Sequence, residues 1–103
     1  MDQPDKLLSN PIRLVVISSL HQVASADFTT LMELTQATKG NLSVQLKKLQ
    51  EAGYIHIKKS FKDNYPNTRC EISKAGKQAF EKHVAYLKRC CEYDVLNSLQ
   101  ISN

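Results

Sequence analysis

The sequence has little cysteine, proline or glycine, with three of each among its 103 residues, and it has no tryptophan. The odd number of cysteines, of which Cys90 and Cys91 are adjacent, argues against a disulfide framework. No apolar run approaches the roughly 18 residues of a membrane span, so we expect no membrane contact. The first ten residues lack a basic segment followed by an apolar block, which argues against a secretory signal and favours the cytoplasm.

Catalytic motifs are missing as well. The sequence has no glycine-rich phosphate loop, and no set of nucleophile, base and orienting residue can be assembled from its pattern. We therefore expect a protein that is not an enzyme and that holds no cofactor.

Positive charge is present, and it is concentrated in one part of the chain. The net charge is +4, but residues 39–69 hold seven basic and two acidic side chains, against seven and eight elsewhere. A concentration of this kind favours a polyanion as partner, whereas a basic surface that only aids solubility would be spread more evenly. The basic residues of this segment are Lys39, Lys47, Lys48, Lys58, Lys59, Lys62 and Arg69.

A helix is predicted over residues 40–52, with Gly53 as its C-terminal cap. Leu42, Leu46 and Leu49 lie within about 60° of one another on such a helix and form a narrow apolar seam. The other face is small, polar or basic, as expected of a helix laid in the major groove of DNA. An ordinary surface helix with solvated lysines is the alternative. The residues of that face are Gly40, Asn41, Ser43, Val44, Lys47, Lys48 and Glu51.

Two helices are predicted before this one. Asn10 and Pro11 are typical of an N-cap and first helical residue, and the helix that follows is apolar over most of its circumference as far as about residue 23. Residues 1–9 read as a loose lead-in, and Phe28 as part of a very short extended piece. Thr30 and Glu33 fit a capping box that begins a short second helix. Two helices joined by a turn with glycine predict a helix-turn-helix.

The period then changes to that of strands. Ile55, Ile57 and Phe61 share one face, residues 62–67 are rich in turn formers, and residues 68–73 alternate again, which predicts a hairpin. Ser73 caps a last helix, from residue 74 to about 99. Its apolar stripe is longer than a small core can cover and predicts pairing between two copies, with folding back over the first helix as the alternative. The predicted dimerisation residues are Leu14, Val84, Leu87, Cys91 and Val95.

This order of elements resembles the winged helix-turn-helix family of transcriptional regulators, in the group with MarR-like and ArsR-like repressors. The resemblance covers about residues 10–88 and rests on residues 38–43, 46–55, 66–68 and 72–80. It implies a mainly α fold with a small β-hairpin (α+β) in a single domain, 1–103, with the helix-turn-helix and wing in 10–73 and a dimerisation helix in 74–99. It also implies a homodimeric repressor that binds an inverted repeat in double-stranded DNA through residues 40–52 and a wing at 58–69.

The predicted DNA contacts differ in chemistry. Asn41, Ser43 and Gln45 can pair with base edges and Val44 can contact a thymine methyl, although Gln45 lies at the edge of the exposed face. The basic residues suit phosphates, which position the protein without specifying sequence. The full predicted set is Thr38, Lys39, Gly40, Asn41, Ser43, Val44, Gln45, Lys47, Lys48, Lys58, Lys59, Lys62, Asn64 and Arg69.

Two other functions remain open from the sequence. One is a redox- or metal-responsive sensor that uses Cys90 and Cys91. His83 and Cys90 stand about 10.5 Å apart in rise along a helix, too far to share one ion, so we expect no metal site within one chain. Cys70 reads as a buried, apolar residue. The other function is a winged helix that binds only protein. A small-molecule effector could sit between the long terminal helix and the DNA-binding part, but no residue identifies it.

Overall fold

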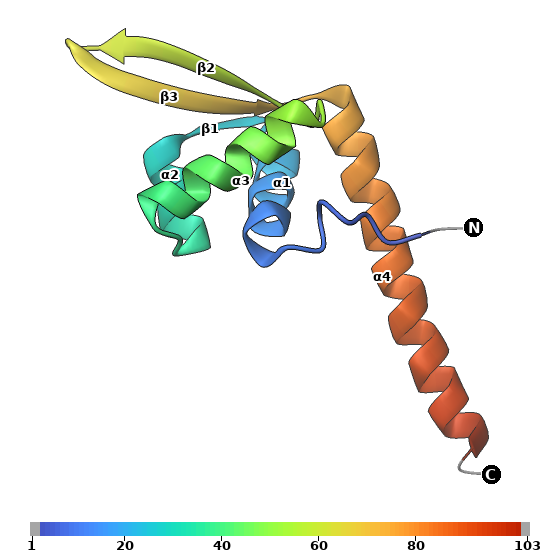
Figure 1. Ribbon diagram of the computed structural model, residues 1–103. Helices are drawn as coiled ribbons and strands as arrows, with labels where there is room; N and C mark the ends of the chain where they lie inside the picture. The colour runs from blue at the N-terminus through green and yellow to red at the C-terminus, as the bar shows by residue number, and fades with distance from the viewer. Residues whose placement is uncertain (1–2, 102–103) are drawn as a thin grey trace.

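Four helices and a three-stranded antiparallel sheet form the part of the chain that the structure describes (Figure 1). This structure is a computed structural model that describes the backbone of residues 3–101 and the side chains of residues 3–92. The elements in order are α1 (Pro11–Val23), β1 (Ser25–Asp27), α2 (Phe28–Thr35), α3 (Lys39–Glu51), β2 (Ile55–Lys62), β3 (Tyr65–Ile72) and α4 (Lys74–Ile101). None of the described helices is long and apolar enough to cross a membrane. The α+β fold predicted from the sequence is confirmed.

The core lies between the helices and the sheet. The predicted leucine seam of α3 is confirmed, since Leu42, Leu46 and Leu49 are all buried. They belong to one cluster with apolar residues of α1 and with Ile55 and Cys70 of the sheet. A fully buried leucine stabilises a fold by about 1.5–3 kcal/mol, so the seam determines which side of α3 remains outside.

The start of α1 is as predicted. The Asn10 side chain accepts hydrogen bonds from the backbone N–H groups of Ile12 and Arg13, and Pro11 is the first helical residue. An asparagine N-cap satisfies donors that have no partner within the helix.

The predicted start of α2 is wrong. Phe28 is already helical, and the N-cap is Asp27, whose carboxylate accepts from the Thr30 backbone N–H. This hydrogen bond holds the pKa of Asp27 below its usual value. Asp27 ends β1 and pairs with Arg69 of β3, so the sheet imposes the extended backbone that an N-cap needs. The capping box of Thr30 and Glu33 is therefore not the one that the fold uses.

The predicted hairpin is confirmed, but its turn is shorter than predicted because residues 65–67 belong to β3, and the sheet gains a third strand. β2 and β3 are joined by a two-residue turn, Asp63 and Asn64, with φ of 53° and 67°. Positive φ at both turn residues suits the twist of paired strands. β1 adds to the other edge of β3, giving the strand order β1-β3-β2. The tip of the hairpin projects beyond the helices, away from α4 (Figure 1).

The N-terminal segment is packed from Asp5 to Leu8, contrary to the loose lead-in predicted from the sequence. Leu8 is fully buried. The Asp5 backbone N–H donates to His83 Nδ1 at 3.1 Å, and the Tyr54 hydroxyl donates to the Asp5 carboxylate at 2.6 Å. Burial and this hydrogen bond raise the pKa of Tyr54 to about 12, so the hydroxyl keeps its proton. The segment thus connects α4 to the start of β2.

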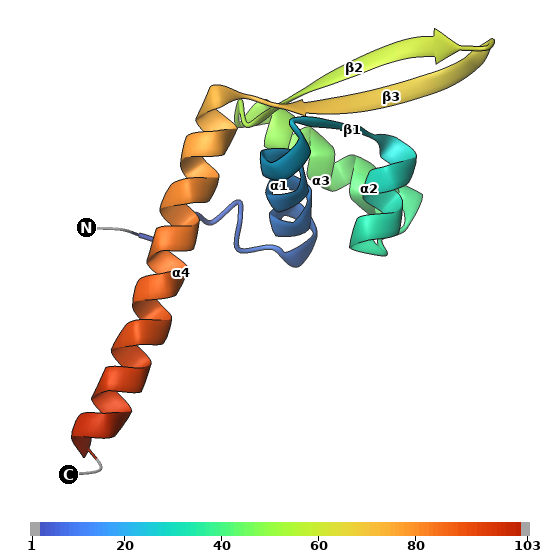
Figure 2. The ribbon, with the colours of Figure 1, turned by 180° about the vertical axis from the view of Figure 1, so that it is seen from behind.

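The first turns of helix α4 pack on α1, which was the alternative to pairing between two copies, and the rest of the helix extends beyond α1 (Figure 1). In these first turns the Phe80 and His21 rings lie 4.9 Å apart and His21 faces Glu81 at 3.6 Å. Beyond them the helix projects away from the other helices (Figures 1 and 2). Val84 is half-buried and Leu87 is 41% exposed. Of the other predicted dimerisation residues, Leu14 packs at the edge of the core, Cys91 is exposed, and Val95 lies outside the described side chains.

The turn into α4 brings two backbones close together. The Ser73 hydroxyl donates to the Gly53 carbonyl and accepts from the Gly76 backbone N–H, which confirms Ser73 as the cap. A Cβ on Gly76 would lie 2.3 Å from the Tyr54 carbonyl oxygen. The first turn of α4 therefore requires a residue without a side chain at this position.

We predict that Gly76→Ala lowers the free energy of unfolding by about 1–3 kcal/mol, because backbone must move to admit the methyl group. Gly40→Ala is the matched control, since a Cβ there meets nothing within 4 Å and alanine favours a helix by up to about 1 kcal/mol. Urea denaturation measures both. Equal stability of Gly76→Ala and the unchanged protein would contradict the close approach.

Candidate nucleic-acid interface

Helix α3 presents its polar face to solvent. Thr38 caps it, accepting from the Asn41 backbone N–H at 3.1 Å, and Gly53 follows it with a φ of 81°. Gly40, Val44 and Lys47 lie within about 60° of one another around the helix, opposite the leucine seam. All three are exposed. The outward face expected from the sequence is therefore present.

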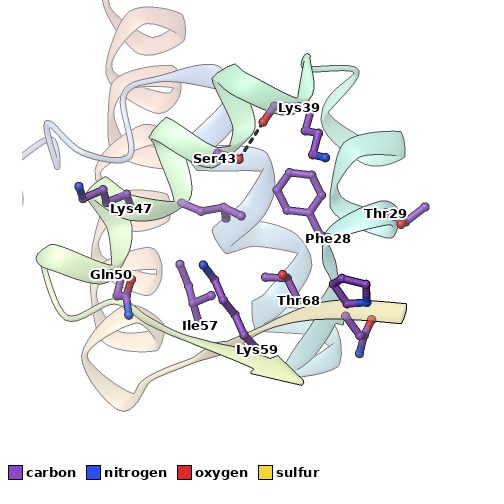
Figure 3. A pocket seen from close by; sticks show the side chains of 12 residues that line it. Phe28, Thr29, Lys39, Ser43, Lys47, Gln50, Ile57, Lys59 and Thr68 are labelled. Atoms are coloured by element: carbon purple, nitrogen blue, oxygen red, sulfur yellow. Dashed lines mark hydrogen bonds between the residues drawn. The ribbon is translucent and has the colours of Figure 1, made fainter. Parts of the chain in front are cut away.

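A groove of about 860 Å³ lies between α3 and the hairpin (Figure 3). Lys39 and Lys47 reach it from α3, and Lys59 reaches it from β2. None of the residues that line it is acidic. Three cations on two separate elements, with no carboxylate between them, form a surface suited to the phosphates of a nucleic acid. Its other lining residues include Phe28, Thr29, Ser43, Gln50, Ile57 and Thr68.

The basic residues of the hairpin divide between its two faces. Ile57, Lys59 and Thr68 face the groove, so by strand alternation Lys58 and Arg69 lie on the opposite face. There Lys58 Nζ is 2.9 Å from the Glu71 carboxylate, which holds the pKa of Glu71 below its usual value. The Arg69 guanidinium donates to the Ser25 hydroxyl at 3.2 Å. Lys58 and Arg69, which were predicted to contact DNA, therefore lie on a different face from the groove lysines.

The structure corrects the assignment of Gln45. Its side chain is only 8% exposed, because α1 covers it. The Arg13 guanidinium donates to Gln45 Oε1, and Gln45 Nε2 donates to Asn41 Oδ1 at 2.9 Å. A glutamine held in this way cannot reach a base edge. The sequence placed Gln45 at the edge of the exposed face. Its hydrogen bond with Arg13, 32 residues earlier in the chain, turns it inward.

The other predicted base contacts lie on opposite flanks of α3. Ser43 lines the groove, and its hydroxyl donates to the Lys39 carbonyl at 2.9 Å. Asn41 and Lys48 are exposed on the flank away from the groove. Lys62 and Asn64 are exposed at the hairpin tip. The structure thus leaves three separate surfaces for contact: the groove, the Asn41 flank and the tip.

Sequence reasoning missed two aromatic residues at the tip. Phe61 is 78% exposed and Tyr65 is 75% exposed. Phe61 shares a strand face with Ile55 and Ile57, as predicted, but the hairpin has already passed beyond the helices at that point. The signal that could have revealed this exposure is the length of the hairpin, whose strands of eight residues each carry its tip beyond the helices (Figure 1).

Of the cysteines named for a redox sensor, Cys90 is half-buried and Cys91 is exposed, and both are free. Among residues 3–92 no group of three or more His, Cys, Asp or Glu side chains is placed to hold a metal ion. Cys70 is buried as expected, and burial raises the pKa of its thiol to about 11, so it stays protonated near neutral pH.

The helix-turn-helix, the hairpin beside it and the cationic groove define a winged-helix transcriptional regulator. The chain belongs to the family of winged helix DNA-binding domains, whose pattern matches residues 12–91. It is 30% identical over 79 residues to the protein MJ0432 of Methanocaldococcus jannaschii, covering 77% of this chain and 86% of that one.

Solved structures show the same fold. The transcriptional regulator homologue from Pyrococcus horikoshii superposes with a TM-score of 0.77 at 27% identity, over 84% of this chain and 85% of that one. The putative regulator ytfH from Salmonella typhimurium superposes with a TM-score of 0.69 at 17% identity, over 94% and 85% of the two chains. At that identity the second likeness concerns the fold alone.

We predict that Lys59→Ala lowers the slope of log affinity against log salt by about one unit on any duplex, because one phosphate contact is lost. Lys58→Ala is the matched control, since the neighbouring lysine points to the opposite face and pairs with Glu71. Fluorescence anisotropy across a salt titration measures both slopes. A loss of the same size in both variants would show that the groove does not hold the DNA backbone.

Proposed function

We propose that this protein is a sequence-specific regulator of transcription that binds an inverted repeat in double-stranded DNA as a homodimer and acts as a repressor. The observation that carries the proposal is the cationic groove beside the exposed face of α3. A protein-binding winged helix would not need three lysines around one hollow, whereas DNA presents phosphates along each edge of its major groove.

In the proposed complex α3 enters the major groove. Its N-terminal residues Asn41 and Ser43 face base edges, and Val44, which is 51% exposed, contacts a thymine methyl. Lys39, Lys47 and Lys59 hold the backbone strand that runs through the hollow between α3 and the hairpin. Lys62 and Asn64 follow the DNA beyond it. Occupancy of the site excludes other proteins from the same DNA, which is the simplest means of repression.

Helix α4 supports the dimer. Its 28 residues extend for about 42 Å, and only the first turns lie against α1. Leu87, 41% exposed, continues an apolar stripe into the projecting part. Two such helices packed together would cover this stripe and place two copies of α3 on one side of the DNA.

A small-molecule effector has a suitable place. NadR, which shares the fold with a TM-score of 0.69 at 17% identity, was solved in complex with 4-hydroxyphenylacetate. In the present protein a hollow of about 330 Å³ lies between the N-terminal segment and α4, lined by Asp5, Tyr54, Lys82 and His83 among others. We place an effector there because a ligand would touch both Tyr54, which follows the DNA-binding helix α3, and the proposed dimerisation helix α4.

The proposed function is tested by selecting bound duplexes from random DNA. We expect enrichment of two inverted half-sites whose centres are about 34–36 Å apart, one turn of the double helix. A control selection with Lys47→Ala should recover the same sequence at lower affinity, because phosphate contacts carry no sequence information. Enrichment of no sequence at all would refute the proposal.

Self-association is tested separately by Leu87→Asp. We expect this variant to sediment as a monomer at micromolar concentration, because a charge enters the apolar stripe between the two helices. Lys88→Asp places the same carboxylate at the next, exposed position, with a larger change of net charge, and should remain dimeric. Identical sedimentation of both variants and the unchanged protein would remove Leu87 from the interface.

A further inference from the structure

Three side chains form a line of hydrogen bonds from the interior to the surface of α3. The Arg13 guanidinium of α1 donates to Gln45 Oε1, and Gln45 Nε2 donates to Asn41 Oδ1 at 2.9 Å. Arg13 is itself held, since its Nε donates to the Leu7 carbonyl at 2.6 Å. Gln45 is 8% exposed, whereas Asn41 is exposed at the end of the line.

The direction of these bonds follows from the chemistry of arginine. A guanidinium has five N–H donors and no acceptor, so only the oxygen of the Gln45 amide can face it. The Gln45 nitrogen must then face Asn41, and Asn41 must receive it with its oxygen. Arg13 therefore fixes the orientation of two successive amides, although an isolated asparagine presents its oxygen and nitrogen equally well.

We infer that Arg13 and Gln45 are positioning residues that set the base preference of Asn41, so that α3 reads a hydrogen-bond acceptor and not a donor at this place. Within the part of the chain that the structure describes, Asn41 Nδ2 has no partner, and it is the group that remains to face a ligand. The inference rests on the proposed function, in which this flank of α3 lies in the major groove.

The consequence for sequence is specific. Guanine presents only acceptors, N7 and O6, at its major-groove edge, and cytosine presents only the N4 donor. Asn41 oriented by Gln45 directs its free Nδ2 donor at the base edge, while its Oδ1 is turned toward Gln45, so it favours the acceptors of guanine over the donor of cytosine. An asparagine free to rotate would not distinguish the two in this way. One position in each half-site should therefore favour guanine over cytosine by about tenfold, the effect of one good hydrogen bond.

Two variants should exchange donor and acceptor at the exposed end of this series of hydrogen bonds. In Asn41→Asp the second carboxylate oxygen faces outward and accepts, so the preference between the two bases should reverse and change from guanine to cytosine. In Gln45→Glu the buried side chain still accepts from Arg13 but no longer donates, so the Asn41 amide turns its nitrogen inward and its oxygen outward. The same change from guanine to cytosine is expected, although residue 45 does not touch DNA. Selection from random DNA measures both.

Two further variants keep the result interpretable. Arg13→Met frees both amides to rotate, so guanine and cytosine should be selected to within about twofold. If Gln45→Glu does not fold, Arg13→Met tests the positioning role in its place. Lys48→Ala, on the same flank of α3, should weaken binding to all duplexes alike and keep the preference of the unchanged protein.

A measurement without DNA separates the inference from the proposed function. In the free protein, NMR should show a Gln45 side-chain amide proton that exchanges slowly with solvent, while the Asn41 side-chain amide protons exchange at the rate of an exposed amide. Arg13→Met should raise the Gln45 exchange rate. Fast exchange at Gln45 in the unchanged protein would overturn the line of bonds, whatever the DNA results.

The DNA results distinguish the two failures. Selection of no sequence by the unchanged protein would overturn both the proposed function and the reading by Asn41. A clear selected sequence in which folded Gln45→Glu keeps the original base would overturn only the positioning role. Equal loss of affinity on all DNA in that variant, with no change of preference, would also overturn it, because that is the result of a merely structural residue.

Discussion

The burial of one side of α3 is the constraint on which the rest of the structure depends. Leu42, Leu46 and Leu49 pack in one cluster with residues of α1 and the sheet, so these three side chains set the rotation of α3 about its own axis. The face opposite this seam has to remain in solvent. This rotation determines which side chains of α3 are exposed to a partner, because the positions are distributed around the helix at fixed angles.

The surroundings of α3 then divide the exposed residues into two environments. On the hairpin side lies a hollow with three lysines, a place for the backbone of a polyanion. On the α1 side lies a line of polar groups that begins at Arg13 and ends at Asn41. In the proposed complex the first environment holds the DNA backbone regardless of sequence, and the second supplies directional hydrogen bonding through Asn41.

Much of this could be predicted from local sequence signals. The leucine spacing, the asparagine cap and first proline of α1, the change of period at residue 55 and the cap at Ser73 each act within a few residues. What local signals missed are contacts between distant parts of the chain. Asp5 meets Tyr54 and His83 across 49 and 78 residues. Asp27 becomes a cap because β1 pairs with a strand more than forty residues later, and Gln45 is buried by a residue of α1.

The third strand has a mechanical consequence. β3 pairs with β2 on one edge and with β1 on the other, and β1 ends at Asp27, immediately before α2 begins at Phe28. The base of the hairpin and the helix-turn-helix are therefore joined by a ladder of backbone hydrogen bonds. In the proposed dimer, a signal that alters binding would act where the two subunits are held relative to each other, so control would depend on their spacing and tilt.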